Sequence, residues 1–238
     1  MDNYATQIDD KLNELKNNSK KFLKFLDKIT SLNPIIIGGF IRNIINDEPV
    51  RDIDIILNSN DDKQIEKIIK IDNLKYKINS FKGYKIFIDN YTIDIWYLKN
   101  HNLFKEGIYE PTINNLNETT FINYDSLVYD LNNKQLNINH YLESINNNMI
   151  NFVGTKEAIE NNKQTFLSIG KIFLISYKKK MDISEEIKEY ILRYYTEYPD
   201  FMKKLKNEYV RHYNLTMDED LEEFIETNIK QYMKKRTN

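Results

Sequence analysis

Two aspartates stand two residues apart in an otherwise apolar run, Asp52-Ile53-Asp54-Ile55-Ile56-Leu57. Side chains of a β-strand alternate between its faces, so Asp52 and Asp54 leave the same face while isoleucines fill the other. Carboxylates this close repel each other unless a cation lies between them, and their oxygens are ligands that Mg²⁺ accepts. The pair therefore predicts a divalent-cation site. The alternative is a solvated edge strand with a salt bridge to Arg51, a residue that lies outside the part of the chain that the structure describes.

A third carboxylate, Asp94, interrupts a second apolar run at residues 91–98. An unpaired charge inside such a strand would cost on the order of several kcal/mol. Asp94 therefore needs a partner, and a metal shared with Asp52 and Asp54 would serve. Asp89 lies near the same turn, so the sequence leaves open which of the two acids is the third ligand.

Gly38 and Gly39 join a short β-branched run at residues 35–37 to a segment with helical spacing. Bare backbone N–H groups at the start of a helix can receive phosphate oxygens. Arg42 follows one turn into the helix, where phosphate binding and a structural ion pair are both reasonable interpretations.

The elements that must position these residues follow from hydrophobic spacing. Helices are predicted over residues 2–18 and over a second amphipathic run at residues 22–29. Strands are predicted at 35–37, 53–57, 84–88 and 91–98, with a helix over 61–71. A hairpin with strands 127–130 and 135–138 comes next, and helices dominate from residue 156 onward. The expected fold class is α+β: a mixed sheet flanked by helices, followed by an all-helical C-terminal lobe.

Composition limits the class of protein. With 238 residues, 41% of them hydrophobic, the chain has enough apolar area for a substantial core. The 34 basic and 36 acidic residues nearly cancel, so a nucleic-acid partner must be argued from local features. The absence of cysteine excludes disulfides and thiolate metal sites. The first thirty residues are too charged for a signal peptide or a spanning helix, so we expect a cytoplasmic protein without membrane insertion.

The run Gly38–Asn43 (GGFIRN), followed by Asp52-Ile53-Asp54, resembles the head of the DNA polymerase β-type nucleotidyltransferase superfamily. The likeness is strongest to class II tRNA CCA-adding enzymes and bacterial poly(A) polymerases. It continues faintly at residues 127–130 and 140–154, which resemble a later head strand and the connector into the family's neck. The resemblance implies N-terminal helices at 1–33 packing on the head, a catalytic head at 34–138 and a helical, neck-like lobe at 139–238.

The same resemblance implies two-metal nucleotidyl transfer. Asp52 and Asp54 would bind two Mg²⁺ ions, with Mn²⁺ as a possible substitute, and Asp94 would help to hold the ion that activates the acceptor hydroxyl. The triphosphate of an NTP or dNTP, ATP among them, would be held by Gly38, Gly39 and Arg42.

The chain also departs from the family pattern. Asn43 replaces an aspartate, residues 119–121 (TTF) replace Arg-Arg-Asp, and residues 161–165 (NNKQT) replace Glu-Asp-x-x-Arg. The family's side chains at the last motif pair with the incoming base, so its C-then-A selection does not carry over. About sixty residues follow, fewer than the family uses to grip tRNA, and a full CCA-adding role is therefore disfavoured. The candidates for contacting base or sugar are Asn162, Thr165 and Lys171.

Two functions follow as hypotheses. The first is a metal-dependent, template-independent nucleotidyltransferase that adds nucleotides to a hydroxyl and releases pyrophosphate. The acceptor is a nucleic-acid 3′ end, a protein hydroxyl such as that of its own Tyr232, or a partner effector protein. Transfer to a protein hydroxyl would resemble the chemistry of oligonucleotide-synthesising anti-phage enzymes. The alternative is a degenerate nucleotidyltransferase fold that serves as a nucleotide-binding or regulatory module.

Overall fold

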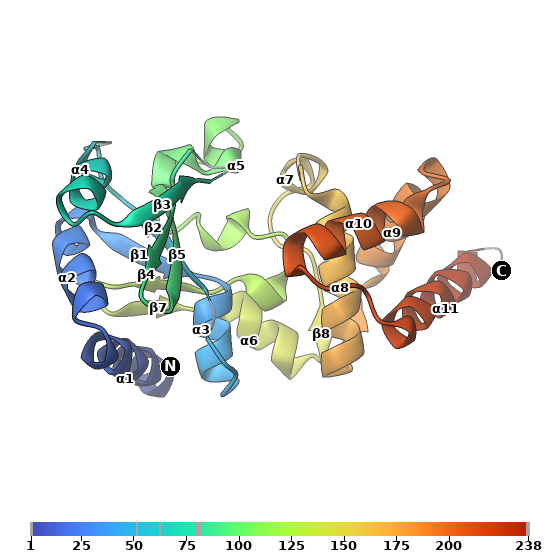
Figure 1. The fold of residues 1–238 in the computed structure, drawn as a ribbon. Coiled ribbons are helices and arrows are strands. Elements are labelled where there is room, and N and C mark those ends of the chain that lie inside the picture. Colours follow the sequence, from blue (N-terminus) through green and yellow to red (C-terminus); the bar gives the residue numbers. More distant parts are fainter. Residues whose placement is uncertain (1, 51, 62, 80–81, 237–238) are drawn as a thin grey trace. The chain divides into compact units, whose positions relative to one another are not determined.

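The computed structural model describes residues 2–50, 52–61, 63–79 and 82–236. The chain divides into two compact units (Figure 1). Unit 1 comprises the chain up to Thr120 together with Asp125–Tyr141, and unit 2 comprises Phe121–Tyr124 and the chain from Leu142 onward. The expected boundary was at residues 138 and 139. Residues 1–33, which we expected to pack on the head, lie in unit 1.

Unit 1 is built on a seven-stranded sheet in the order β3-β4-β5-β2-β1-β6-β7. The strands are β1 Pro34–Ile37, β2 Asp52–Leu57, β3 Lys75–Ile78, β4 Tyr84–Ile88, β5 Tyr91–Tyr97, β6 Val128–Asp130 and β7 Gln135–Asn137. Among the described residues, β2 and β5 pair in parallel and all other neighbours in this sheet pair antiparallel. The predicted mixed sheet is confirmed.

Most predicted strands agree with the structure to within a residue, but one strand and one helix start of unit 1 differ further. Strand β3 was not predicted, because its four side chains are all exposed and no hydrophobic alternation marks it. The helix predicted over 61–71 begins later, as α4 Gln64–Ile71.

The helices of unit 1 besides α4 are α1 Asp2–Asn18, α2 Lys20–Ile29, α3 Gly39–Ile45 and α5 Asn102–Lys105. Ser19 begins α2: its Oγ accepts a hydrogen bond from the Phe22 backbone N–H at 3.0 Å, which satisfies one of the free donors of the first turn. In Figure 1, α1 and α2 lie side by side at the start of the chain.

The two faces of the central strands are covered by different parts of unit 1. On one face, the ring of Phe22 packs against Tyr91 of β5, with ring centroids 5.1 Å apart. On the other face, Ile56 and Trp96 join an apolar cluster that includes Leu98, Phe104 and Leu116. Alternation along β2 and β5 puts Asp54 and Asp94 on this second face, beside Ile56 and Trp96.

Unit 2 is mainly helical, as predicted. Its helices are α7 Lys156–Glu160, α8 Thr165–Lys179, α9 Glu185–Glu197, α10 Phe201–Tyr213 and α11 Glu219–Arg236, and α6 Asn139–Asn146 runs across the division between the units. A small parallel pair, β8 Met149–Ile150 with β9 Asp182–Ile183, adds the strands that the prediction lacked. Helix α8 packs against both α10 and α11. None of the described helices combines the length and apolar character needed to cross a bilayer.

Candidate active site

The three predicted carboxylates lie on one face of two adjacent strands. Asp54 of β2 and Asp94 of β5 are register partners, and Asp52 pairs with Thr92 one step along the same face. Asp54 and Asp94 are half-buried, whereas Asp52 is exposed at the start of β2. The sheet therefore gathers the acids that the sequence singled out.

Lys85 of β4 supplies the positive charge beside these acids. Its register partner is Asp94, and its ammonium forms an ion pair with Asp94 Oδ2. Burial pushes the pKa of Lys85 down, but the hydrogen bond to Asp94 and the charges of Asp94, Asp52 and Asp54 outweigh it, so this pKa is raised. The charges of all three carboxylates thus raise the pKa of one ammonium group, that of Lys85. Sequence reasoning missed Lys85, since nothing in the run around it marks a site.

Asn79 and Gly83 shape the loop that leads into β4. The Gly83 N–H donates to Asn79 Oδ1 at 2.8 Å, and Asn79 Nδ2 lies 3.5 Å from Asp94 Oδ1. A Cβ on Gly83 would come within 2.1 Å of the Ile95 carbonyl oxygen, closer than atoms can approach. Only glycine lets the loop lie this close to β5, so Gly83 helps to fix the register of Lys85 and Asp94. An isolated glycine before a strand was the one available signal.

The donor chemistry of this cluster suits a hard divalent cation, because its ligands are carboxylate oxygens that need a shared positive charge. In the described part of the chain, no three His, Cys, Asp or Glu side chains are close enough to hold a metal together. Lys85 provides the neutralising charge in this structure. Metal binding by Asp52, Asp54 and Asp94 therefore stays a prediction.

Asp89, the alternative third ligand, is engaged elsewhere. It lies in the β4–β5 turn with φ +51°, accepts a hydrogen bond from Ser19 Oγ, and has Lys21 at 3.7 Å. These contacts tie the turn to the start of α2. The geometry therefore favours Asp94 over Asp89 as the partner of Asp54.

The glycine turn precedes α3 as predicted. Gly38 has φ +66°, a region that side chains other than glycine rarely adopt, and its N–H donates to the Leu127 carbonyl at 2.9 Å. A Cβ on Gly39 would meet only Arg42 Nη2 at an ordinary 3.6 Å. Conformation thus requires glycine at position 38, and sterics do not require it at position 39.

Arg42 is held by an ion pair inside unit 1. Its Nη1 pairs with Asp125 Oδ1, and the two side chains are only 17% and 15% exposed. This contact agrees with the structural interpretation of Arg42, and its role in phosphate binding stays a prediction. Asp125 was not singled out in the sequence, where it lies 83 residues from Arg42.

No protein-family model matches the sequence, and no curated protein matches it. A CCA-adding enzyme in complex with CTP superposes with a TM-score of 0.64 at 16% identity, covering 94% of this chain and 54% of that one. A tRNA nucleotidyltransferase complexed with a primer tRNA and an incoming ATP analog gives 0.62 at 13% identity, covering 87% and 59%. The Thermotoga maritima CCA-adding enzyme complexed with tRNA gives 0.61 at 15% identity, covering 90% and 52%.

The chain has the nucleotidyltransferase fold. The predicted resemblance to the CCA-adding enzymes is thereby confirmed at the level of the fold. The chain spans between about half and three-fifths of the length of these three solved structures.

In the helical part of this nucleotidyltransferase fold, Asn162 and Thr165 form hydrogen bonds at the start of α8. Asn162 Oδ1 accepts from the Gln164 N–H and its Nδ2 donates to Ser168 Oγ, both at 3.0 Å. Thr165 Oγ1 donates to the Asn162 carbonyl at 3.0 Å. Lys171 lies further along α8 and is half-buried. Both polar atoms of the Asn162 side chain thus have partners next to or within α8, and the three predicted base contacts stay predictions.

Tyr232, the predicted protein primer, is packed within unit 2. Its side chain is 8% exposed and its hydroxyl donates to Asn228 Oδ1 on the same helix at 3.2 Å. The Lys188 ammonium lies 5.5 Å from the ring centroid. Burial raises the pKa of Tyr232 to about 12. A buried, weakly acidic hydroxyl is a poor nucleophile, so the structure gives the primer hypothesis little support.

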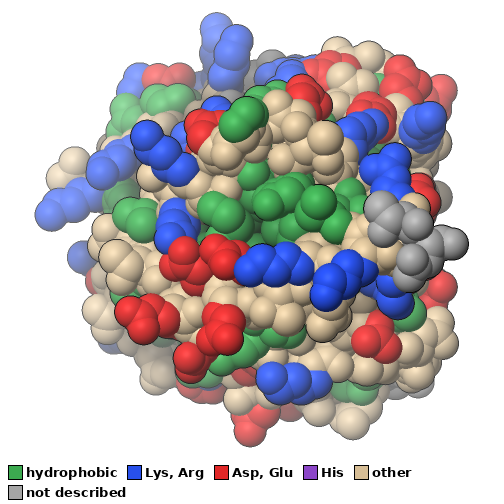
Figure 2. Space-filling model, turned by 90° about the vertical axis from the view of Figure 1, so that its right-hand side faces the viewer, with side chains coloured by type: hydrophobic (Ala, Val, Ile, Leu, Met, Phe, Trp, Pro, Cys, Tyr) green, Lys and Arg blue, Asp and Glu red, His purple; other side chains and the backbone are tan. Residues whose placement is uncertain are grey.

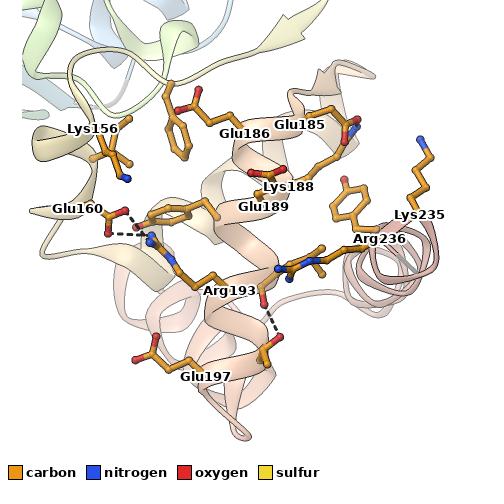
Figure 3. Close-up of a pocket in the computed structure, with 16 residues that line it drawn as sticks. Lys156, Glu160, Glu185, Glu186, Lys188, Glu189, Arg193, Glu197, Lys235 and Arg236 are labelled. Atoms are coloured by element: carbon orange, nitrogen blue, oxygen red, sulfur yellow. Dashed lines mark hydrogen bonds and ion pairs between the residues drawn. The ribbon is translucent and has the colours of Figure 1, made fainter. Parts of the chain in front are cut away.

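A groove of about 880 Å³ runs between α7, α9 and α11 of unit 2. Figure 2 shows apolar side chains in a hollow bordered by basic and acidic ones, and Figure 3 shows Arg193 reaching Glu160, with contacts of 2.8 and 3.0 Å. Five acidic and five basic residues line the groove. Since these charges balance, the groove lacks the positive potential that a nucleic acid would favour.

Proposed function

We propose that the chain is a metal-dependent, template-independent nucleotidyltransferase that transfers a nucleotide from an NTP or dNTP to a hydroxyl and releases pyrophosphate. The observation that carries this proposal is the pairing of Asp54 with Asp94 on parallel strands, with Asp52 on the same face. The fold shared with solved tRNA nucleotidyltransferases supports it.

In this proposal, Asp52 and Asp54 hold two Mg²⁺ or Mn²⁺ ions, and Asp94 helps to hold the ion on the acceptor side. Bound divalent ions supply charge neutralisation for the phosphates and acidify the acceptor hydroxyl. The backbone N–H groups of Gly38 and Gly39 would orient the triphosphate. Arg42 could take part only by exchanging Asp125 for a phosphate, because the two are paired in this structure.

For the acceptor, we favour a nucleic-acid 3′ end over a protein hydroxyl. One of the similar structures holds a primer tRNA, and another a tRNA, whereas Tyr232 of this chain is buried. Base and sugar selection by Asn162, Thr165 and Lys171, a partner effector protein and a role in anti-phage defence stay predictions.

The decisive experiment measures pyrophosphate release with each of the eight nucleotides, Mg²⁺ and a single-stranded RNA or DNA primer. We expect activity that disappears in Asp52→Ala and persists in Asp220→Ala, a matched change at an exposed aspartate of α11. A signal that survives Asp52→Ala would overturn the catalytic assignment. Nucleotide binding without pyrophosphate release from any nucleotide would instead favour the binding-module hypothesis.

A second experiment separates the acceptors. Products labelled from an α-³²P nucleotide are digested with nuclease or with protease. We expect the label to be released by nuclease and to resist protease. Label that is attached to the chain and lost in Tyr232→Phe, but kept in Tyr195→Phe, would establish the protein primer instead.

A further inference from the structure

A row of charged side chains crosses four strands of unit 1. The register partners run from Lys77 of β3 to Lys85 of β4, then to Asp94 of β5 and Asp54 of β2. Directly paired residues project from the same face of a sheet. The row is therefore basic at the sheet edge and acidic at its centre, and Lys85 stands where the two halves meet.

The contacts around Lys85 hold its ammonium at the acidic half. It pairs with Asp94 Oδ2, while Asn79 Nδ2 lies 3.5 Å from the other oxygen of Asp94. Lys77, directly across on β3, is exposed and carries the same charge as Lys85. Repulsion from Lys77 and attraction to the acids both favour this position. The Asp94 carboxylate is thus engaged at both oxygens.

The side-chain exposures show that the ion pair is neither fully buried nor freely solvated. Lys85 is 37% exposed and Asp94 is 17% exposed. A fully buried pair would be hard to separate without loss of the fold, and a fully exposed one would be too weak to matter. An ammonium in this setting can be displaced by a stronger cation while still opposing its entry.

We infer that Lys85 is a built-in competitor of the divalent cation: its ammonium neutralises the Asp52, Asp54 and Asp94 cluster in the nucleotide-free chain and must leave Asp94 before that residue can ligate a metal. This inference rests on the proposed function, since it concerns the same three carboxylates. Lys85 weakens the affinity of the chain for free divalent ions and stabilises the metal-free sheet.

The test is a calorimetric titration of the full chain with Mn²⁺, without nucleotide. We expect Lys85→Met to bind Mn²⁺ about tenfold more tightly than wild type, because the competing charge is gone. Lys85→Arg, which keeps the charge, should bind within about twofold of wild type. Lys70→Met, which removes an ion-paired lysine from the surface of α4, is the matched control and should leave the affinity unchanged.

A second variant and a second measurement distinguish the expected effect from misfolding of Lys85→Met. Lys85→Gln removes the charge and keeps a hydrogen-bond donor for Asp94, so it should also bind Mn²⁺ more tightly. In thermal unfolding, both neutral variants should be less stable than wild type without metal and should gain more stability from saturating Mn²⁺.

The outcomes separate this inference from the proposed function. Equal or weaker Mn²⁺ binding by both neutral variants, with binding lost in Asp54→Asn, would overturn the role of Lys85 and leave the metal site in place. No Mn²⁺ binding by wild type or by either neutral variant would overturn both.

Discussion

Asp54 and Asp94 face each other across the one parallel pairing in the described part of the seven-stranded sheet. Parallel register brings the two carboxylates to the same height on the same face, although they are forty residues apart in sequence. An acid on each of two adjacent strands can share a cation, and neither can do so alone. This relationship makes the two residues interdependent.

Asp54→Asn and Asp94→Asn should each lower the rate of nucleotidyl transfer by about 10² to 10³, because each change removes a charged ligand without altering shape. The measurement is steady-state pyrophosphate release, with circular dichroism to show that the fold is kept. Wild-type rates in Asp94→Asn would remove this residue from the site.

Asp89 should behave differently, because it serves the fold. Ser19→Ala removes both the cap of α2 and the hydrogen bond to Asp89, and it should lower the free energy of unfolding by about 1 to 2 kcal/mol. The rate per folded molecule should stay within about twofold of wild type. Denaturant unfolding and the pyrophosphate assay measure the two quantities. A stable Ser19→Ala protein with a large loss of rate would return Asp89 to consideration.

Much of the fold can be predicted from the sequence where burial leaves a hydrophobic pattern. The central strands β1, β2 and β5 are rich in isoleucine, and their alternation also predicts that Asp52 and Asp54 share a face. Strand β3 leaves no such pattern, since both of its faces are exposed at the sheet edge. A strand without buried side chains is specified by its neighbour and not by its own sequence.

The site was predictable only in part, for a similar reason. The acids of the site can be recognised in the sequence because they are charged residues inside apolar strands. Lys85 lies in a run of mixed polarity, and its partnership with Asp94 depends on the register of β4 against β5. Asp125 meets Arg42 only after the chain has folded. Partners across strands and loops are properties of the register, which local spacing does not encode.

Gly83→Ala should be strongly destabilising. The added Cβ would meet the Ile95 carbonyl oxygen at 2.1 Å, and backbone atoms cannot move aside without breaking the β4–β5 pairing. We expect a loss of about 3 kcal/mol in the free energy of unfolding. Gly107→Ala is the matched control: Gly107 has φ +72° but nothing within 4 Å of its Cβ position, so only conformational strain of about 1 kcal/mol is expected. Equal losses in the two variants would show that contact with β5 is not the cause.

Arg42 and Asp125 should be energetically coupled. Both side chains are mostly buried and paired with each other, so removing either one leaves an uncompensated charge. In a double-mutant cycle with Arg42→Gln and Asp125→Asn, we expect a coupling free energy of about 1 to 3 kcal/mol in unfolding. Additive losses would mean that the pair does not stabilise the fold.

His101 should make the stability of unit 1 depend on pH. The ring is half-buried and packs near Phe104, with centroids 5.4 Å apart, and burial lowers the pKa of His101 from 6.5 to about 4. Between these values the unfolded chain binds a proton that the folded chain does not, so stability falls as pH falls from 6.5 to 4. The loss should be about 3 kcal/mol at pH 4. Denaturant unfolding at several pH values should show this loss of unfolding free energy in wild type. The same loss should occur in His212→Gln, which alters an exposed histidine of α10. The loss should be absent from His101→Gln. If the unfolding free energy of that variant depends on pH as in wild type, other groups cause the pH dependence.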